Sequence, residues 1–117
     1  MIENFGIGID ISSIEKFKNK PFKENKNFYK KIFSGNEINF CLKSANCYEK
    51  FAAKFAIKEA TIKSIHQKLF FSDIETLHSN SKPIIKILNS NNNYRFLVSV
   101  SHDNGIAVAV VISEKIK

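Results

Sequence analysis

Several residue types and segment types are scarce in this chain, and each scarcity excludes a class of protein. Among 117 residues there are two cysteines, Cys41 and Cys47, and their C-x5-C spacing fits neither a redox pair nor half of a usual zinc site. We therefore expect two buried thiols. No apolar run reaches the length of a membrane span, and the N-terminus lacks the basic and apolar regions of a signal peptide. The length of 117 residues predicts a single domain over residues 1–117, and these absences predict a cytoplasmic protein with no membrane partner.

Arginine is almost absent, whereas lysine is abundant. The chain has seventeen lysines and only one arginine, Arg95. Because arginine makes the commonest specific contact to guanine and stacks on exposed bases, this scarcity argues against base-reading recognition of nucleic acid.

The net charge of +7 is unevenly distributed, since residues 16–31 hold seven lysines against one acid, Glu24. Such a patch attracts a polyanion, for example nucleic acid, an anionic membrane surface, an acidic protein or a phosphorylated cofactor. The alternative is a lysine-rich composition that spreads this residue over any solvated surface. The seven residues, called the lysine patch below, are Lys16, Lys18, Lys20, Lys23, Lys26, Lys30 and Lys31.

The first half of the chain has helical signals after an initial strand at 3–11. Ser34 and Glu37 form a capping-box pattern that predicts a helix start, and a long segment without glycine or proline at 47–66 carries apolar residues at three- and four-residue intervals. The expected helices are 12–19, one or two amphipathic turns within 22–33, a helix from 34 to about 43, and 47–66.

The second half of the chain has strand signals instead. Alternating or short apolar runs are separated by turn residues. Helices followed by antiparallel strands are typical of an α+β fold, here one long central helix packed on a small, mainly antiparallel sheet. The expected strands are 72–79, 83–89, 95–102 and 105–113, with turns at 80–82, 89–93 and 102–105.

One carboxylate stands in the apolar run GIGIDIS at residues 6–12. Alternation along a strand places Gly6, Gly8 and Asp10 on one face, so that Asp10 projects from a surface almost without side chains. Either something other than side chains fills that space, or the glycines allow a close backbone approach and Asp10 caps the following helix.

A second carboxylate lies beside the apolar stripe of the long helix. Phe55, Glu59 and Lys63 follow one another at four-residue steps along one helix face, while Lys58 projects about a hundred degrees away. The first interpretation is a surface ion pair between Glu59 and Lys63, which contributes only a few tenths of a kcal/mol. The second is a functional carboxylate that needs a cation, since its position near the core costs desolvation.

A histidine ends the third segment, SVSHDNG. His102 closes a strand where Asp103, Asn104 and Gly105 can turn the chain into the last strand. It is either a simple turn residue or a residue presented at a strand end.

Together, GIGID, FAIKEATIK and VSVSHDNGIAVAVV resemble the holo-acyl-carrier-protein synthase family of phosphopantetheinyl transferases. Gly8-Ile9-Asp10 and the run from Phe55 to Lys63 meet each position of the superfamily pattern, and the resemblance covers essentially the whole chain. It implies transfer of 4′-phosphopantetheine from coenzyme A to a serine of apo acyl carrier protein, with release of adenosine 3′,5′-bisphosphate, in support of fatty acid biosynthesis. It also implies a homotrimer with active sites between protomers.

The resemblance also implies roles for individual residues. Asp10 and Glu59 would hold Mg²⁺, in space that Gly6 and Gly8 leave for the pyrophosphate arm of coenzyme A, and both would act in catalysis with Lys63. The implied coenzyme A contacts are Lys54, Lys58, Lys63 and His102, the last from a neighbouring subunit, with Lys54 at a position where the family often has arginine. In the lysine patch, Lys16, Lys20 and Lys23 would bind acyl carrier protein.

One departure from the family pattern concerns the segment after the long helix. Family members have a glycine-rich stretch there, whereas this chain has SIHQKLFFSD, so the contacts to coenzyme A must be made differently. The general base stays open between Glu59, Asp10 acting through a metal-bound water, and a group on the substrate. A non-catalytic basic module that binds nucleic acid or an acidic protein is the alternative function.

Overall fold

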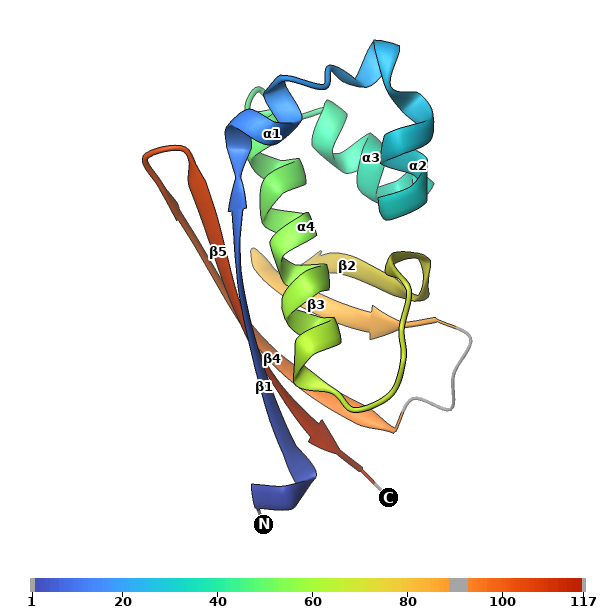
Figure 1. The fold of residues 1–117 in the computed structure, drawn as a ribbon, viewed down its shortest axis with the longest axis vertical. Helices are drawn as coiled ribbons and strands as arrows, with labels where there is room; N and C mark the ends of the chain where they lie inside the picture. Colours follow the sequence, from blue (N-terminus) through green and yellow to red (C-terminus); the bar gives the residue numbers. More distant parts are fainter. Residues whose placement is uncertain (1, 89–92, 117) are drawn as a thin grey trace.

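After a first strand, the fold places helices before further antiparallel strands, and a computed structural model describes it for residues 2–88 and 93–116 (Figure 1). In chain order the elements are η1 (Ile2–Asn4), β1 (Phe5–Ser13), α1 (Ile14–Lys18), η2 (Phe22–Glu24), α2 (Lys26–Ile32), α3 (Gly35–Leu42), α4 (Cys47–Ser64), η3 (Phe71–Asp73), β2 (Ile74–Ser79), β3 (Lys82–Ile87), β4 (Tyr94–Asp103) and β5 (Ile106–Lys115). Strands β1, β5 and β4 form an antiparallel sheet in that order, and β2 and β3 pair as a separate antiparallel hairpin. Helix α4 packs on the sheet, while α1, α2 and α3 gather near its N-terminal end (Figure 1). The predicted α+β fold is confirmed.

The element boundaries follow local hydrogen bonding. The capping box at the start of α3 is present, with the Glu37 backbone N–H donating to the Ser34 hydroxyl at 3.2 Å and the Ser34 N–H donating to the Glu37 carboxylate at 2.8 Å. The helix expected from residue 12 begins two residues later, because Ser12 and Ser13 stay paired with β5. Within the described part, no helix is long and apolar enough to cross a membrane.

Two of the three expected turns are confirmed. Asn80 and Ser81 join β2 to β3, and Asn104 and Gly105 join β4 to β5, all four with positive φ angles, as the tight hairpin turns of right-twisted strands require. The turn expected at 89–93 falls, apart from Asn93, outside the described residues.

The glycine face of β1 is filled by the backbone of α4. A Cβ atom on Gly6 would overlap the Ser64 carbonyl oxygen, and one on Gly8 would overlap the Ala60 carbonyl oxygen. The close backbone approach is therefore confirmed, and the idea that these glycines leave room for the pyrophosphate arm of a ligand is wrong. The two glycines let helix α4 lie directly against strand β1. Side chains of these two elements can therefore meet where the contact ends.

The opposite face of the sheet is apolar and exposed. Ile7, Ile9 and Ile11 project there from β1 with 56–68% of their surface exposed, and Leu97 of β4 projects from the same sheet with 71% exposed. Exposed apolar patches of this kind usually mark interaction sites.

The core has two parts, which share helix α4. Aromatic rings from α1, α2 and α4 form the first, around Phe17, Tyr29 and Phe51, and small residues of α4 pack against the strands in the second. Cys41 is fully buried in the first part, which raises the pKa of its thiol to about 12, and Cys47 is half-buried. Both cysteines are free thiols.

Candidate functional site

The carboxylate of Asp10 meets an ammonium group from α4. Asp10 Oδ1 lies 3.3 Å from Lys63 Nζ, which also donates to the Ile9 carbonyl oxygen at 3.0 Å. Asp10 Oδ2 is inaccessible to solvent and has no hydrogen-bond partner among the described residues. Asp10 does not cap the following helix, because α1 begins only at Ile14 with Ser13 as its N-cap. An unpartnered carboxylate oxygen at this position is suited to a cation.

Glu59 lies one helical turn before Lys63 on α4 and is half-buried. The simple surface pair between these two residues is not formed in the described structure, since the ion pair of Lys63 is with Asp10. The fold thus brings β1 against the C-terminal half of α4, where Asp10 contacts Lys63 and Glu59 lies one helical turn before that lysine. No cluster of three or more histidine, cysteine, aspartate or glutamate side chains occurs among residues 2–88 and 93–116. Mg²⁺ nevertheless needs only one or two carboxylates when substrate phosphates complete its ligands, so Asp10 and Glu59 fit this ion.

Lys58 points to the other side of α4 and is fully buried. Its ammonium lies 2.8 Å from a Glu37 carboxylate oxygen and donates to the carbonyl oxygens of Ile32 at 2.7 Å and Phe71 at 3.2 Å. Burial lowers the pKa of Lys58, and the charge of Glu37 opposes that shift. With these partners, the ammonium ties α2, α3 and the segment after α4 together inside the chain, at a place closed to coenzyme A.

Lys54 is also buried, one turn earlier on α4. Its ammonium donates to the Thr76 hydroxyl at 2.8 Å and carbonyl oxygen at 3.2 Å, and it lies 4.8 Å from the centroid of the Phe40 ring. Burial lowers the pKa of Lys54, with a smaller contribution in the same direction from the nearby Lys58. Unlike Lys58, Lys54 lines a cavity.

This cavity, of about 250 Å³, lies between α4, the β2–β3 hairpin and the end of β4, and we call it the hairpin cavity. His102 lines it, with Nδ1 3.2 Å from a Glu49 carboxylate oxygen. A second histidine, His78, stacks on Phe40 with 4.5 Å between ring centroids and 17° between planes. The structure therefore places Lys54 and His102 of one chain on one cavity, whereas the resemblance implies that His102 reaches coenzyme A from a neighbouring subunit.

Sequence reasoning missed Glu37, Glu49 and the pair of Phe40 and His78. Glu37 was recognised only as a capping residue. The others are joined only through contacts between elements distant in sequence, so no local pattern of spacing reveals them.

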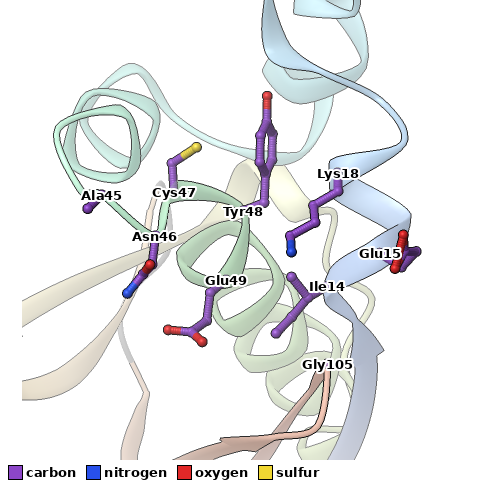
Figure 2. A pocket seen from close by; sticks show the side chains of 9 residues that line it. All are labelled: Ile14, Glu15, Lys18, Ala45, Asn46, Cys47, Tyr48, Glu49 and Gly105. Carbon is purple, nitrogen blue, oxygen red and sulfur yellow. The ribbon is translucent and has the colours of Figure 1, made fainter.

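A second hollow, of about 480 Å³, opens beside the lysine patch (Figure 2). It lies between α1, the first turn of α4 and the β4–β5 turn, and charges of both signs line it, from Glu15, Lys18 and Glu49. The mixture of charges gives this hollow no preference for an anion.

The three lysines expected to bind a partner, Lys16, Lys20 and Lys23, are all exposed at the α1 and α2 end of the molecule. Lys16 Nζ lies 4.2 Å from the centroid of the Phe55 ring and Lys20 Nζ 4.9 Å from that of Phe28, so aromatic rings support two of the three charges. They form a surface separate from the hairpin cavity.

Known proteins match this chain over nearly its whole length. The profile of the 4′-phosphopantetheinyl transferase superfamily matches residues 6–111. A holo-[acyl-carrier-protein] synthase of Thermodesulfovibrio yellowstonii is 36% identical over 115 residues, which are 96% of this chain and 98% of that protein.

Similar solved structures include complexes with coenzyme A or a part of it. The holo-[acyl-carrier-protein] synthase of Helicobacter pylori in complex with coenzyme A has a TM-score of 0.79 and 32% identity, covering 92% of this chain and 99% of that one. The synthase of Bacillus anthracis in complex with CoA (3′,5′-ADP) has a TM-score of 0.75 and 32% identity, covering 94% and 96%.

Proposed function

Because the chain belongs to the 4′-phosphopantetheinyl transferase superfamily, as an enzyme of the holo-acyl-carrier-protein synthase group, we propose that it transfers 4′-phosphopantetheine from coenzyme A to a serine of apo acyl carrier protein. The products are the holo carrier and adenosine 3′,5′-bisphosphate, and the reaction supports fatty acid biosynthesis in the cytoplasm. The observation that carries the proposal is the contact of Asp10 with Lys63. In the part of the chain that the structure describes, the second Asp10 carboxylate oxygen has no partner, and it lies beside the helix that carries Glu59.

Asp10 and Glu59 are the residues that hold Mg²⁺ in this proposal. The ion supplies positive charge to the phosphates of coenzyme A, and phosphoryl transfer depends mainly on such charge neutralisation and on positioning. Lys63 has 54% of its side chain exposed, so its ammonium can turn from Asp10 toward a phosphate. Glu59, or Asp10 through a bound water, acts as the general base unless a group on the substrate does so.

Lys54 and His102 bind coenzyme A at the hairpin cavity, which takes the nucleotide part of this substrate. The cavity offers positive charge from Lys50 and Lys54 and an aromatic surface at the pair of Phe40 and His78. Lys54 acts as a point charge, without the two-pronged contact of an arginine. Lys58 does not take the direct contact expected from the resemblance, since its burial and three partners support a role in holding α4.

The lysine patch is the docking surface for acyl carrier protein, through Lys16, Lys20 and Lys23. Its charge suits an acidic protein partner, and its exposure leaves it available.

A homotrimer completes the proposed enzyme. The exposed isoleucines on the outer face of β1 support burial against another copy of the chain, since a face this apolar is rarely left to solvent. Active sites then lie between protomers, with Glu59 of one facing His102 of the next. Inactive Glu59→Ala and His102→Ala chains should regain activity when mixed, and no recovery after confirmed subunit exchange would mean that each site is made within one chain.

The test of the function is incubation of the protein with coenzyme A, Mg²⁺ and apo acyl carrier protein, followed by mass spectrometry of the carrier. We expect a mass increase equal to one phosphopantetheine group, dependent on Mg²⁺. An unmodified carrier at any Mg²⁺ concentration would contradict the proposal. Binding of a polyanion that Mg²⁺ weakens as other salts do would instead identify the alternative, a non-catalytic basic module.

A further inference from the structure

The hairpin cavity contains one residue whose charge opposes the binding of an anion. Its lining includes Lys50, Lys54 and the two histidines His78 and His102, and Glu49 is the only acid among the described residues that line it. An acid in a cavity meant for a phosphorylated ligand weakens binding by charge repulsion, unless it does something that compensates.

The structure shows what Glu49 contacts. It lies in the first turn of α4, and its carboxylate oxygen Oε2 is 3.2 Å from Nδ1 of His102 at the end of β4. In Figure 2 the carboxylate points away from Lys18, although Glu49 also borders that hollow. The Glu49 side chain is 27% exposed and that of His102 is 50% exposed, so the pair joins two elements at the edge of the cavity.

From this contact we infer that Glu49 is a positioning residue, which fixes the His102 ring so that Nε2 is presented to a phosphate of coenzyme A. The inference rests on the proposed function and deepens it, since it explains how one of the coenzyme A contacts is oriented.

The chemistry of imidazole carries the argument. Its two ring nitrogens are distinct, and the hydrogen bond made by one decides which is protonated and where the other points. A carboxylate at Nδ1 accepts the proton donated there and fixes the ring, and in the imidazolium form the second donor, Nε2–H, faces an anion. Without Glu49, the half-exposed ring at the end of a strand is free to rotate, and the contact to the phosphate is then made only part of the time.

If Glu49 only repels the ligand, its removal should raise the affinity for coenzyme A, whereas if it positions His102, its removal should lower that affinity. The expected weakening by Glu49→Ala is about three- to fivefold, the range for a partly exposed charged pair. Glu49→Gln keeps an oxygen that accepts from Nδ1–H, and we expect its affinity to stay within about twofold of wild type.

The experiment measures the Kd for coenzyme A by isothermal titration calorimetry on the full-length protein. The proteins compared are wild type, Glu49→Ala, Glu49→Gln, His102→Ala and the double variant Glu49→Ala/His102→Ala. Glu15→Ala is the matched control, because it removes an exposed acid that borders only the other hollow. Thermal melts establish that each variant is folded. Nitrogen-15 spectra of the histidine side chains report the protonation and hydrogen bonding of His102 Nδ1 and Nε2 directly, and we expect Glu49→Ala, but not Glu15→Ala, to change them.

In the His102→Ala background, Glu49→Ala should no longer weaken binding, because the ring it positions is gone. Equal or tighter binding by Glu49→Ala in the presence of His102 would overturn the inference. If His102→Ala weakens binding while Glu49→Ala does not, only the role of Glu49 fails. If wild type binds no coenzyme A, the proposed function fails, and the inference fails with it.

Discussion

Helix α4 makes two lysine–carboxylate pairs on different sides, and they differ in almost every physical respect. Lys58 and Glu37 form a pair in which neither side chain is exposed and the charged atoms are 2.8 Å apart. Lys63 and Asp10 form a pair 3.3 Å apart in which the lysine is 54% and the aspartate 15% exposed. We call the first the closed pair and the second the open pair.

The two carboxylates also differ in how far their oxygens are used. Glu37 accepts from Lys58, from the Ser34 N–H, and from both the N–H and the hydroxyl of Thr76, at 2.7 to 2.8 Å. Asp10 accepts from Lys63, and its Oδ2 has no partner within residues 2–88 and 93–116. A saturated carboxylate can only hold structure together, whereas an unsaturated one has capacity for a ligand. Both pairs take their lysine from α4, so charge and sequence spacing alone do not distinguish a structural pair from a functional one.

Breaking the closed pair should give the largest effect. Lys58→Met leaves the Glu37 charge buried without its cation, and removing one partner of such a pair typically costs about 3–5 kcal/mol. Urea unfolding followed by circular dichroism measures this loss. Replacing both residues, with Glu37→Leu and Lys58→Met, should recover part of the stability, and a loss below about 1 kcal/mol for Lys58→Met alone would show that the pair is not essential to the fold.

Removing Asp10 of the open pair, or the neighbouring Glu59, should change activity and leave stability nearly unchanged. Asp10→Ala and Glu59→Ala each remove one side of the proposed metal site, and we expect turnover to fall about a hundredfold or more, as for loss of a main electrostatic contact in a transition state. The free energy of unfolding should change by less than about 1 kcal/mol, since the Asp10 pair is partly exposed. Wild-type turnover by either variant at limiting Mg²⁺ would contradict the metal assignment.

Local periodicity was sufficient to predict the α+β fold and the faces of β1 and α4 on which Asp10 and Lys63 lie, whereas only the family resemblance grouped these two residues. Alternation along β1 places Asp10 on the inner face, the four-residue step places Lys63 with Glu59, and the capping box at Ser34 starts a helix where expected. The glycines were harder to interpret, since the same two positions suit a ligand or a closely packed helix, and only the position of α4 decides between them.

The closed pair could not be predicted from the sequence. Lys58 belongs to the same motif as Glu59 and Lys63, and nothing local to the motif shows that its ammonium turns inward to Glu37, which comes from a different helix. The contact of Glu49 with His102 has the same origin, since it joins the first turn of α4 to the end of β4. Pairings of this kind depend on tertiary packing.

The lysine patch provides a third kind of lysine, exposed and in neither pair. Replacing Lys16, Lys20 and Lys23 by glutamate should raise the KM for acyl carrier protein several-fold and flatten its salt dependence, because steering by exposed charges is screened over about 8 Å at physiological ionic strength. The KM for coenzyme A should stay nearly unchanged. If both KM values increase together, the patch contributes to the overall positive electrostatic potential of the protein and does not dock the carrier specifically. If neither KM changes, the lysines have no binding role and are only solvated.

The smallest expected effect is on the pH dependence of stability, and it comes from His78, which lies near Lys54 and Lys50 of α4. Burial lowers the pKa of His78, and the charges of Lys54 and Lys50 lower it further. As pH falls below about 6.5, the unfolded chain takes up this proton before the folded chain does, so the folded state loses stability on acidification. His78→Phe removes the titrating group and keeps a ring to stack on Phe40.

We therefore expect the Tm to fall less for His78→Phe than for wild type between pH 7 and pH 5, by about 2 °C, because His78 is largely exposed and its shift is moderated by solvent. The exposed His66, beyond the C-terminal end of α4, supplies the matched control, and His66→Gln should follow the wild-type curve. Carboxylates common to all three proteins titrate in the same range and cancel in the comparison. Identical pH dependence in wild type and His78→Phe would show that neither burial nor the neighbouring lysines of α4 lower the pKa of His78 enough to affect stability.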